Sequence, residues 1–170
     1  EIVVEPPIVQ ERHPPIWLTA GRPGSIRASA RRGAHLLLDQ YSPLHAVFER
    51  AEIFRDQLRQ MGVDPQDRQI ALARGLFIAK DAAEKADVIA RRPKARNFVD
   101  QLAEKPDGDT AASIMQFKGP EKAIDGVLIG TLNEIAERLE VIRQGGIEYL
   151  LLSNVGGGAA SLRQFSKAFI

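Results

Sequence analysis

The amino-acid sequence predicts an α/β fold with a parallel sheet. Short apolar runs near Trp17, Leu37, Leu72 and Leu151 alternate with segments of helical periodicity, and this alternation gives parallel strands joined by right-handed crossovers. The run at residues 149–152 is apolar at every position, which is typical of a strand covered on both faces. The helix before it has a start signal and a stop signal. An open doubly wound sheet and part of an eight-stranded barrel both fit these observations.

Composition limits the classes of function. The 170 residues are 44% hydrophobic and 26% charged, as in a globular domain with one core. A formal net charge of +1 predicts neither a nucleic-acid partner nor a membrane-surface partner, and no apolar run reaches the roughly 18 residues of a membrane span. Zero cysteines exclude a disulfide framework, a thiol nucleophile and a thiolate metal site. The three histidines lack metal-ligand spacing, so we expect no metal and, by default, a cytoplasmic protein.

The chain opens with an extended segment. Residues 1–15 hold four prolines, which rule out a helix and indicate a proline-rich connector. Residues 16–20 form a first buried strand, and the Gly-Arg-Pro-Gly sequence after it is a turn. We expect Ser25 to cap a helix over residues 26–32 and Gly33 to end it, because glycine adopts the left-handed conformation without strain.

Two more pairs of strand and helix follow. Residues 35–39 form a second short strand, and the Ser-Pro dipeptide after it opens a helix that a glycine ends. Residues 69–79 are a longer third strand, which Arg74 and Gly75 interrupt. Asp81 starts a further helix.

The last third of the chain divides into an unclear part and a clear part. Residues 91–124 have no clear period, and we interpret them as an insertion or a lid. Thr131 and Glu134 then have the spacing of a capping box, so a helix begins there and ends at a glycine pair. The fourth strand follows, and an amphipathic helix over residues 161–169 completes the chain.

Four pieces of the sequence resemble a known family in their order and spacing. They are Pro-Pro-Ile-Trp-Leu-Thr-Ala-Gly at residues 14–21 with the helix and strand after it, Leu-Ile-Gly-Thr at 128–131, Gly-Gly-Ile-Glu-Tyr-Leu-Leu-Leu at 145–152, and a last helix with Leu162 and Phe165. Together they are similar to the luciferase-like flavin-dependent monooxygenases. The resemblance implies a (β/α)8 TIM barrel, of which this single α/β domain supplies about the second half, strands five to eight.

Half of a barrel is not expected to be stable by itself. A slice of four strands leaves two strand edges unpaired and an apolar interior uncovered. We therefore predict that the chain is a fragment of a longer protein, or that another chain or a second copy supplies the missing N-terminal half. A homo-oligomer is expected on the same ground.

The barrel fold places its binding site at the carboxyl ends of the strands. In the family, hydroxyls and amides after the fifth strand hold the flavin phosphate at a helix start, and the resemblance places Ala20, Gly21, Arg22 and Ser25 there. Arg22 and Pro23 stand where the family has serines. The Arg22 guanidinium can grip a phosphate with two hydrogen bonds, or the change can mean that flavin binding is altered or lost. The glycines are equally well explained as turn residues.

A second group of residues is expected at the rim of the substrate or cofactor site. It comprises Asp39, Tyr41, Arg74 and Asn154. For Arg74 we favour an ion pair with Asp39 at the edge of the core over a contact to the ligand. The glycines at residues 156–158 are interpreted first as a flexible loop and second as a cofactor clamp.

The resemblance implies a monooxygenase that uses reduced FMN and O2 to oxidise a small-molecule substrate, with a separate flavin reductase supplying the cofactor. A deazaflavin-dependent oxidoreductase on the same scaffold is an alternative, and so is a non-catalytic half-barrel that acts as an interaction or scaffold protein. Catalytic side chains of the family lie mostly on the earlier strands, so the catalytic residues stay unknown.

Overall fold

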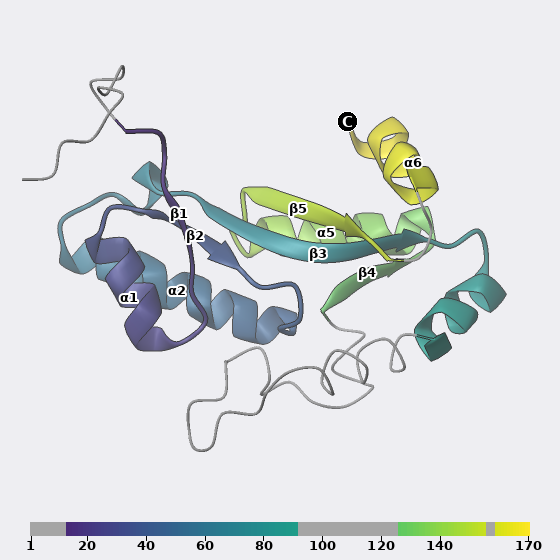
Figure 1. Cartoon of the computed structure of the whole chain (residues 1–170), viewed down its shortest axis with the longest axis horizontal. Helices are drawn as coiled ribbons and strands as arrows, with labels where there is room; N and C mark the ends of the chain where they lie inside the picture. Colours follow the sequence, from purple (N-terminus) through teal and green to yellow (C-terminus); the bar gives the residue numbers. More distant parts are fainter. Residues whose placement is uncertain (1–12, 92–125, 156–158) are drawn as a thin grey trace, which may run out of the picture.

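The computed structural model describes residues 13–91, 126–155 and 159–170. The predictions for most of the connector, for the insertion or lid and for the glycines at 156–158 lie outside the described residues. In chain order, the elements of Figure 1 are β1 (Trp17–Thr19), α1 (Pro23–Arg31), β2 (His35–Leu38), α2 (Leu44–Gln60), η1 (Pro65–Asp67), β3 (Ile70–Ile78), a helix over residues 82–91, β4 (Val127–Gly130), α5 (Leu132–Gln144), β5 (Tyr149–Asn154) and α6 (Ala159–Phe169).

β3 is the centre of the sheet, and its neighbours run parallel to it (Figure 1). β5 pairs with one edge of β3, from Ala71 to Leu76. β2 and β4 pair with the other edge in succession, β2 with its first residues and β4 with its last. β1 pairs with β2 on the outside. Each described strand is parallel to its neighbours and is followed by a helix, which confirms the predicted class of fold.

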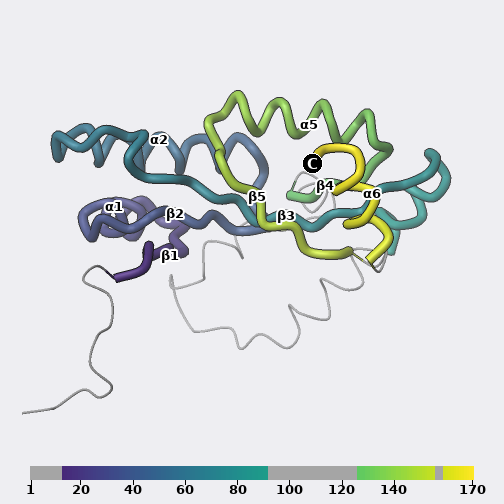
Figure 2. Tube along the Cα trace, turned by 90° about the horizontal axis from the view of Figure 1, so that it is seen from above, coloured from purple at the N-terminus to yellow at the C-terminus, as the bar shows by residue number. Residues whose placement is uncertain are grey.

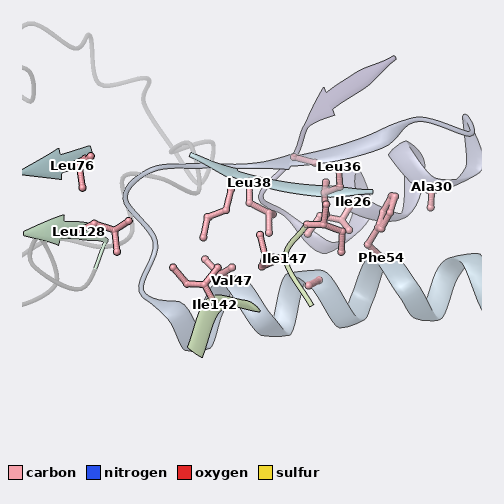
Figure 3. Packing of buried hydrophobic residues seen from close by; sticks show 14 of the residues in the cluster. Ile26, Ala30, Leu36, Leu38, Val47, Phe54, Leu76, Leu128, Ile142 and Ile147 are labelled. Atoms are coloured by element: carbon pink, nitrogen blue, oxygen red, sulfur yellow. The ribbon is translucent and has the colours of Figure 1, made fainter. Parts of the chain in front are cut away.

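Helices cover one face of this sheet. α2 and α5 lie along the same side of the strands, and α1 packs against α2 (Figure 2). The side chains that the central strands present to the helices are almost fully buried, namely Leu36, Leu38, Ile70, Leu72 and Leu76. They meet Ile26, Val47, Phe54 and Ile142 of the helices in one cluster, part of which Figure 3 shows. Because each buried Leu or Ile contributes about 1.5–3 kcal/mol, this layer holds the domain together.

Among the described residues the opposite face is open along β5, so the prediction that this strand is covered on both faces is wrong. Leu150 and Leu152 pack against the core, so the alternation of a strand turns Tyr149 and Leu151 to the other side. These two side chains expose 47% and 48% of their surface. In the described part of the chain, a second cluster covers this face near the end of β3, through Phe77, Ala79, Val127 and Ile129 with Val88 and Ile89 of the helix over 82–91. The open stretch is the uncovered apolar interior expected of a partial barrel.

The predicted glycine stop signals of three helices and the predicted start signal of α5 are confirmed. Gly33, Gly62 and Gly146 have φ angles of 70°, 70° and 73°, which only glycine adopts readily. At the start of α5 the Thr131 N–H donates to the Glu134 carboxylate at 2.8 Å, and the Glu134 N–H donates to Thr131 Oγ1 at 3.5 Å. This is the capping box that the sequence predicts.

Three local predictions are wrong. β4 is a fifth strand, where the sequence analysis has only a lead into the helix; four residues are too few to show a period. β3 continues through Arg74 and Gly75 without a break, because the arginine finds carbonyl partners beside the strand. Ser25 does not cap α1, since the N-cap residue is Arg22 and no side chain makes the capping hydrogen bond.

α6 completes the edge of β3 that β5 leaves free. β5 ends level with Leu76, so the N–H of Ile78 needs another partner. The buried hydroxyl of Ser161 accepts it at 3.1 Å. α6 begins at residue 159, two residues before its predicted start, and thereby places Ser161 in its first turn.

Candidate ligand site at the carboxyl edge of the sheet

The carboxyl ends of the strands stand at different heights. Thr19 of β1 pairs with Leu37, which pairs with Ala71 of β3, whereas Asn154 of β5 pairs with Leu76. Position 76 is five residues beyond position 71, so the end of β5 lies farther along the sheet. At the rise of a β-strand this difference is about 16 Å. The fold therefore does not bring Asn154 level with the segment after β1.

The first predicted group lies where β1 leads into α1. Ala20 exposes 7% of its surface and belongs to the core, so only its backbone can approach a ligand. Gly21 is half-buried, and Arg22 and Ser25 are exposed. Arg22 is the N-cap residue in an extended conformation, with φ −94° and ψ 144°. The four residues thus form one continuous turn at the start of α1.

This helix start is open and electropositive. It has no side-chain cap and no acidic residue in its first turn, and Pro23 at the first position lacks an N–H. The N–H groups of Gly24 and Ser25 have no partner within the helix. A Cβ added to Gly24 would meet nothing within 4 Å, so the space beside this residue is open. Because the helix dipole adds about half a positive charge here, the site can accept an anion.

The side chain of Asp39 closes the loop after β2. Its Oδ1 accepts the N–H groups of Tyr41 and Ser42 at 2.8 Å each, and its Oδ2 accepts the Ser42 hydroxyl and the Arg50 guanidinium at 2.7 Å each. Burial alone would raise the pKa of Asp39, but the hydrogen bonds of Ser42 and Tyr41 and the charge of Arg50 together lower it. The carboxylate is therefore ionised at neutral pH and engaged inside the protein.

Arg74 lies in the middle of β3 with 1% of its surface exposed. Nη1 donates to the carbonyls of Ala73 and Asp39 at 3.0 and 2.9 Å, and Nη2 donates to the carbonyl of Ser42 at 2.8 Å. Arg74 thus contacts the backbone of Asp39, while Arg50 takes the carboxylate. Burial lowers the pKa of Arg74 to about 10, so the guanidinium remains charged at neutral pH.

Gln40 and Ser153, which follow or end strands but are not among the predicted site residues, join the predicted Tyr41 in a polar chain. Gln40 Nε2 donates to the Tyr41 hydroxyl at 2.7 Å, and the Ser153 hydroxyl donates to Gln40 Oε1 at 3.4 Å. β2 and β5 flank β3 on opposite sides, so the hydrogen bonds that join Tyr41, Gln40 and Ser153 cross over β3. Ser153 alternates with the core-facing Leu152, which places the crossing on the open face. The signal in the sequence was the position of both residues at strand ends.

At the opposite edge of the sheet, His35 connects three strands. Its ring stacks on Trp17 of β1 with 4.7 Å between centroids, and its Nδ1 accepts the N–H of Gln69 beside β3 at 2.9 Å. Burial lowers the pKa of His35, and the charge of Arg68 adds to this effect against that of Glu148. These contacts give His35 a structural place, far from the carboxyl edge.

Within residues 13–91, 126–155 and 159–170, no group of three or more His, Asp and Glu side chains could hold a metal ion. No helix in the described part of the chain is long and apolar enough to cross a membrane. What these residues offer at the rim is anion binding at α1 and hydrogen bonding at the loop after β2.

Solved structures share this fold at low sequence identity. The monooxygenase RslO1 from Streptomyces bottropensis has a TM-score of 0.69 at 20% identity, covering 97% of this chain and 50% of that one. An F420-dependent secondary alcohol dehydrogenase, in complex with an F420-acetone adduct, has a TM-score of 0.71 at 17% identity, with 94% and 49% covered. Riboflavin lyase RcaE, with modified FMN and riboflavin, has 0.62 at 15%, with 89% and 41% covered. The chain therefore spans about half the length of the first two and less of the third.

Sequence comparison gives the family. No curated protein matches the chain. A family model described as luciferase-like monooxygenase matches residues 1–149, which is most of the sequence. The structural likenesses agree with it and confirm a parallel α/β fold of the TIM-barrel type. The chain belongs to the luciferase-like monooxygenase family.

Proposed function

We propose that this chain supplies the cofactor-binding half of a flavin-type oxidoreductase, in the first place an FMN-dependent monooxygenase that oxidises a small organic substrate with O2. The observation that carries the proposal is the open, uncapped start of α1 directly after β1. The riboflavin lyase that shares the fold was solved with modified FMN, which supports a flavin-type cofactor.

The residues at this helix start fit a phosphorylated flavin. A guanidinium can hold a phosphate with two parallel hydrogen bonds, and Arg22 stands at the N-cap of α1. The N–H groups of Gly24 and Ser25, with the exposed Ser25 hydroxyl, add donors in the same turn. The backbone of Ala20 and Gly21 leads into it from β1. All of these donors favour a dianion over a neutral group.

When bound, a reduced flavin would supply the chemistry that activates O2. The chain's own residues bind and orient: the start of α1 holds the phosphate, and Gln40 and Tyr41 offer an amide and a phenol to the rest of the ligand. The open apolar face around Leu151 would exclude water once the N-terminal half of the barrel covers it. That half would come from the same chain, another chain or a second copy.

A deazaflavin-dependent oxidoreductase is the second candidate. The F420-dependent alcohol dehydrogenase that shares the fold favours it. The two candidates differ in the acceptor: the monooxygenase consumes O2 together with reduced FMN, whereas the deazaflavin enzyme exchanges a hydride with its substrate and needs no O2. If neither activity is found, the third alternative is a non-catalytic half-barrel.

Titration of the full-length protein with FMN, reduced FMN and F420 tests the proposal. We expect Arg22→Ala to weaken cofactor binding about tenfold or more, because it removes a charge-assisted hydrogen bond. Arg27→Ala is the matched control, since it removes the same charge from an exposed position of the same helix, five residues after Arg22. Equal losses in both variants, or no binding of any of the three, would overturn the assignment. Oxygen-dependent consumption of reduced FMN then separates the two enzymes.

The proposed partners follow from the same function. A separate flavin reductase would deliver reduced FMN, and a cytoplasmic location would give access to it. We also propose that the full-length protein forms a homo-oligomer, which predicts an assembly of two or more copies in its sedimentation analysis. A monomer that retains full activity would contradict this last point.

A further inference from the structure

We propose that Arg74 is a positioning residue for the ligand site: its hydrogen bonds to the loop after β2 fix the Gln40–Tyr41 pair on the open face, where the pair meets the cofactor. The inference rests on the proposed function and deepens it. From the sequence, Arg74 was expected to contact the ligand or to pair with the Asp39 carboxylate. In the structure it binds the backbone carbonyls of Asp39 and Ser42, and Arg50 pairs with the carboxylate.

Packing of the core does not require an arginine at position 74. Arg74 lies on the helix-covered side of β3, in line with Leu72 and Leu76, and is as deeply buried as they are. A buried charge is costly unless it is fully hydrogen-bonded, and an aliphatic side chain would fill this place without that cost. The reason to have a guanidinium is therefore found in what it binds.

The two hydrogen-bond partners of Arg74 outside β3 belong to one loop. Nη1 reaches the carbonyl of Asp39, and Nη2 reaches the carbonyl of Ser42, three residues farther on. Arg50 of α2 binds the side chains of the same two residues. The loop is thus held at both ends from the helix side. Only a planar fork spans two carbonyls in this way; a lysine would be a single point charge.

Gln40 and Tyr41 lie between the two anchored residues, Asp39 and Ser42. The side chains of Gln40 and Tyr41 bond to each other and, through Ser153, to β5 across the open face. The Tyr41 carbonyl also packs so closely on Gly126 that an added Cβ there would lie 2.6 Å away. With both anchors fixed, the Gln40 amide and the Tyr41 phenol are held at one place on the rim. A shift of the anchors would move them together.

The test is ¹⁹F NMR on protein that carries 3-fluorotyrosine, because the chain has two tyrosines, Tyr41 and Tyr149. In Arg74→Lys we expect the Tyr41 resonance to shift or broaden while that of Tyr149, at the other end of β5, stays in place. Cofactor affinity should fall about two- to tenfold, because misplacing the Gln40–Tyr41 pair weakens a neutral hydrogen bond to the ligand. Leu76→Val is the control: it perturbs the same side of β3 and leaves the hydrogen bonds of Arg74 to the loop in place.

The outcomes separate the two proposals. An unchanged Tyr41 resonance in Arg74→Lys, or an equal change in Leu76→Val, would overturn the positioning role. If the wild type binds neither FMN nor F420, the proposed function fails and the cofactor part of this inference fails with it, while the Tyr41 resonance still decides whether Arg74 sets the loop. Should Arg74→Lys not fold, Arg74→Met, which keeps the apolar stem and removes the buried charge, takes its place in the same comparison.

Discussion

The two faces of this sheet carry the same kinds of residue but differ in burial. Leu72 of β3 faces α2 and α5 and is fully buried, while Leu151 of β5, paired with the next position of β3, exposes 48% of its surface. Both lie in the same stretch of sheet, so local propensity does not separate them. The difference is whether an element lies above the residue.

This contrast divides the work of the molecule. The covered face has the apolar cluster and also the buried arginines Arg50 and Arg74. Both arginines donate hydrogen bonds to the loop after β2 from the helix side of the sheet. The open face has Tyr149, Leu151 and the polar chain from Gln40 to Ser153. Stability is therefore concentrated on the first face, and the second is available for a ligand or for the rest of a barrel.

The largest expected effect breaks the contrast directly. Leu72→Ala should lower the free energy of unfolding by about 2–5 kcal/mol, because it leaves a cavity in the core. Leu151→Ala, the same change on the open face, should cost less than about 1 kcal/mol. Urea unfolding of the two variants measures this difference. Similar losses in both would mean that the open face is covered in solution.

The next effect concerns Asp39, the residue that follows β2. Asp39→Asn should cost about 2 kcal/mol at neutral pH, since it removes the charge that Arg50 pairs with. Folding lowers the pKa of Asp39 below its ordinary 3.8, so its stabilisation is present above that pH and is lost as the pH falls through the lower folded value. The gap between wild type and variant should narrow on acidification.

Urea unfolding at pH 7 and near pH 3 measures this gap. Asp56→Asn serves as the control, because Asp56 is an exposed acid of α2 that pairs with Arg59 at the surface. Its effect should be small at both values of pH. A gap for Asp39→Asn that does not change with pH would show that the Asp39 charge is not what stabilises the loop.

The smallest expected effect lies at the other end of the strands. Trp17 is the sole tryptophan and stacks on His35, so its fluorescence should fall when that imidazole takes up a proton. Because folding lowers the pKa of His35, the midpoint should lie below 6.5, and stability that is present above 6.5 should be lost as the pH falls through the folded value. His35→Gln should abolish the transition and His45→Gln, an exposed position, should keep it. A transition that survives in His35→Gln would refute the assignment.

The sequence predicts well those features whose cause is local. The helix of α5 lies between a capping box and a glycine pair, and both signals are read within a few residues. The parallel sheet follows from the alternation of strands and helices. β4 was missed because its four residues are buried only by neighbours that come from elsewhere, α5 on one side and the helix over 82–91 on the other.

The candidate site is less predictable for the same reason. The sequence places Asp39, Tyr41 and Arg74 near strand ends, but it does not show that Arg50 takes the Asp39 carboxylate and leaves the carbonyl to Arg74. The contact of Gln40 with Ser153 joins residues that are 113 positions apart. Such pairings depend on the strand order and register, which no local pattern encodes.

The central claim is that one face of this sheet is finished and the other is open for completion. A cysteine-free chain allows a direct test by thiol labelling of Leu151→Cys, with Val47→Cys as a fully buried control of similar shape. In the 170-residue chain, Cys at position 151 should react at close to the rate of a free thiol while Cys at position 47 is protected, and added N-terminal half of the barrel should protect position 151 as well. Equal protection of the two positions in the chain alone would contradict the account.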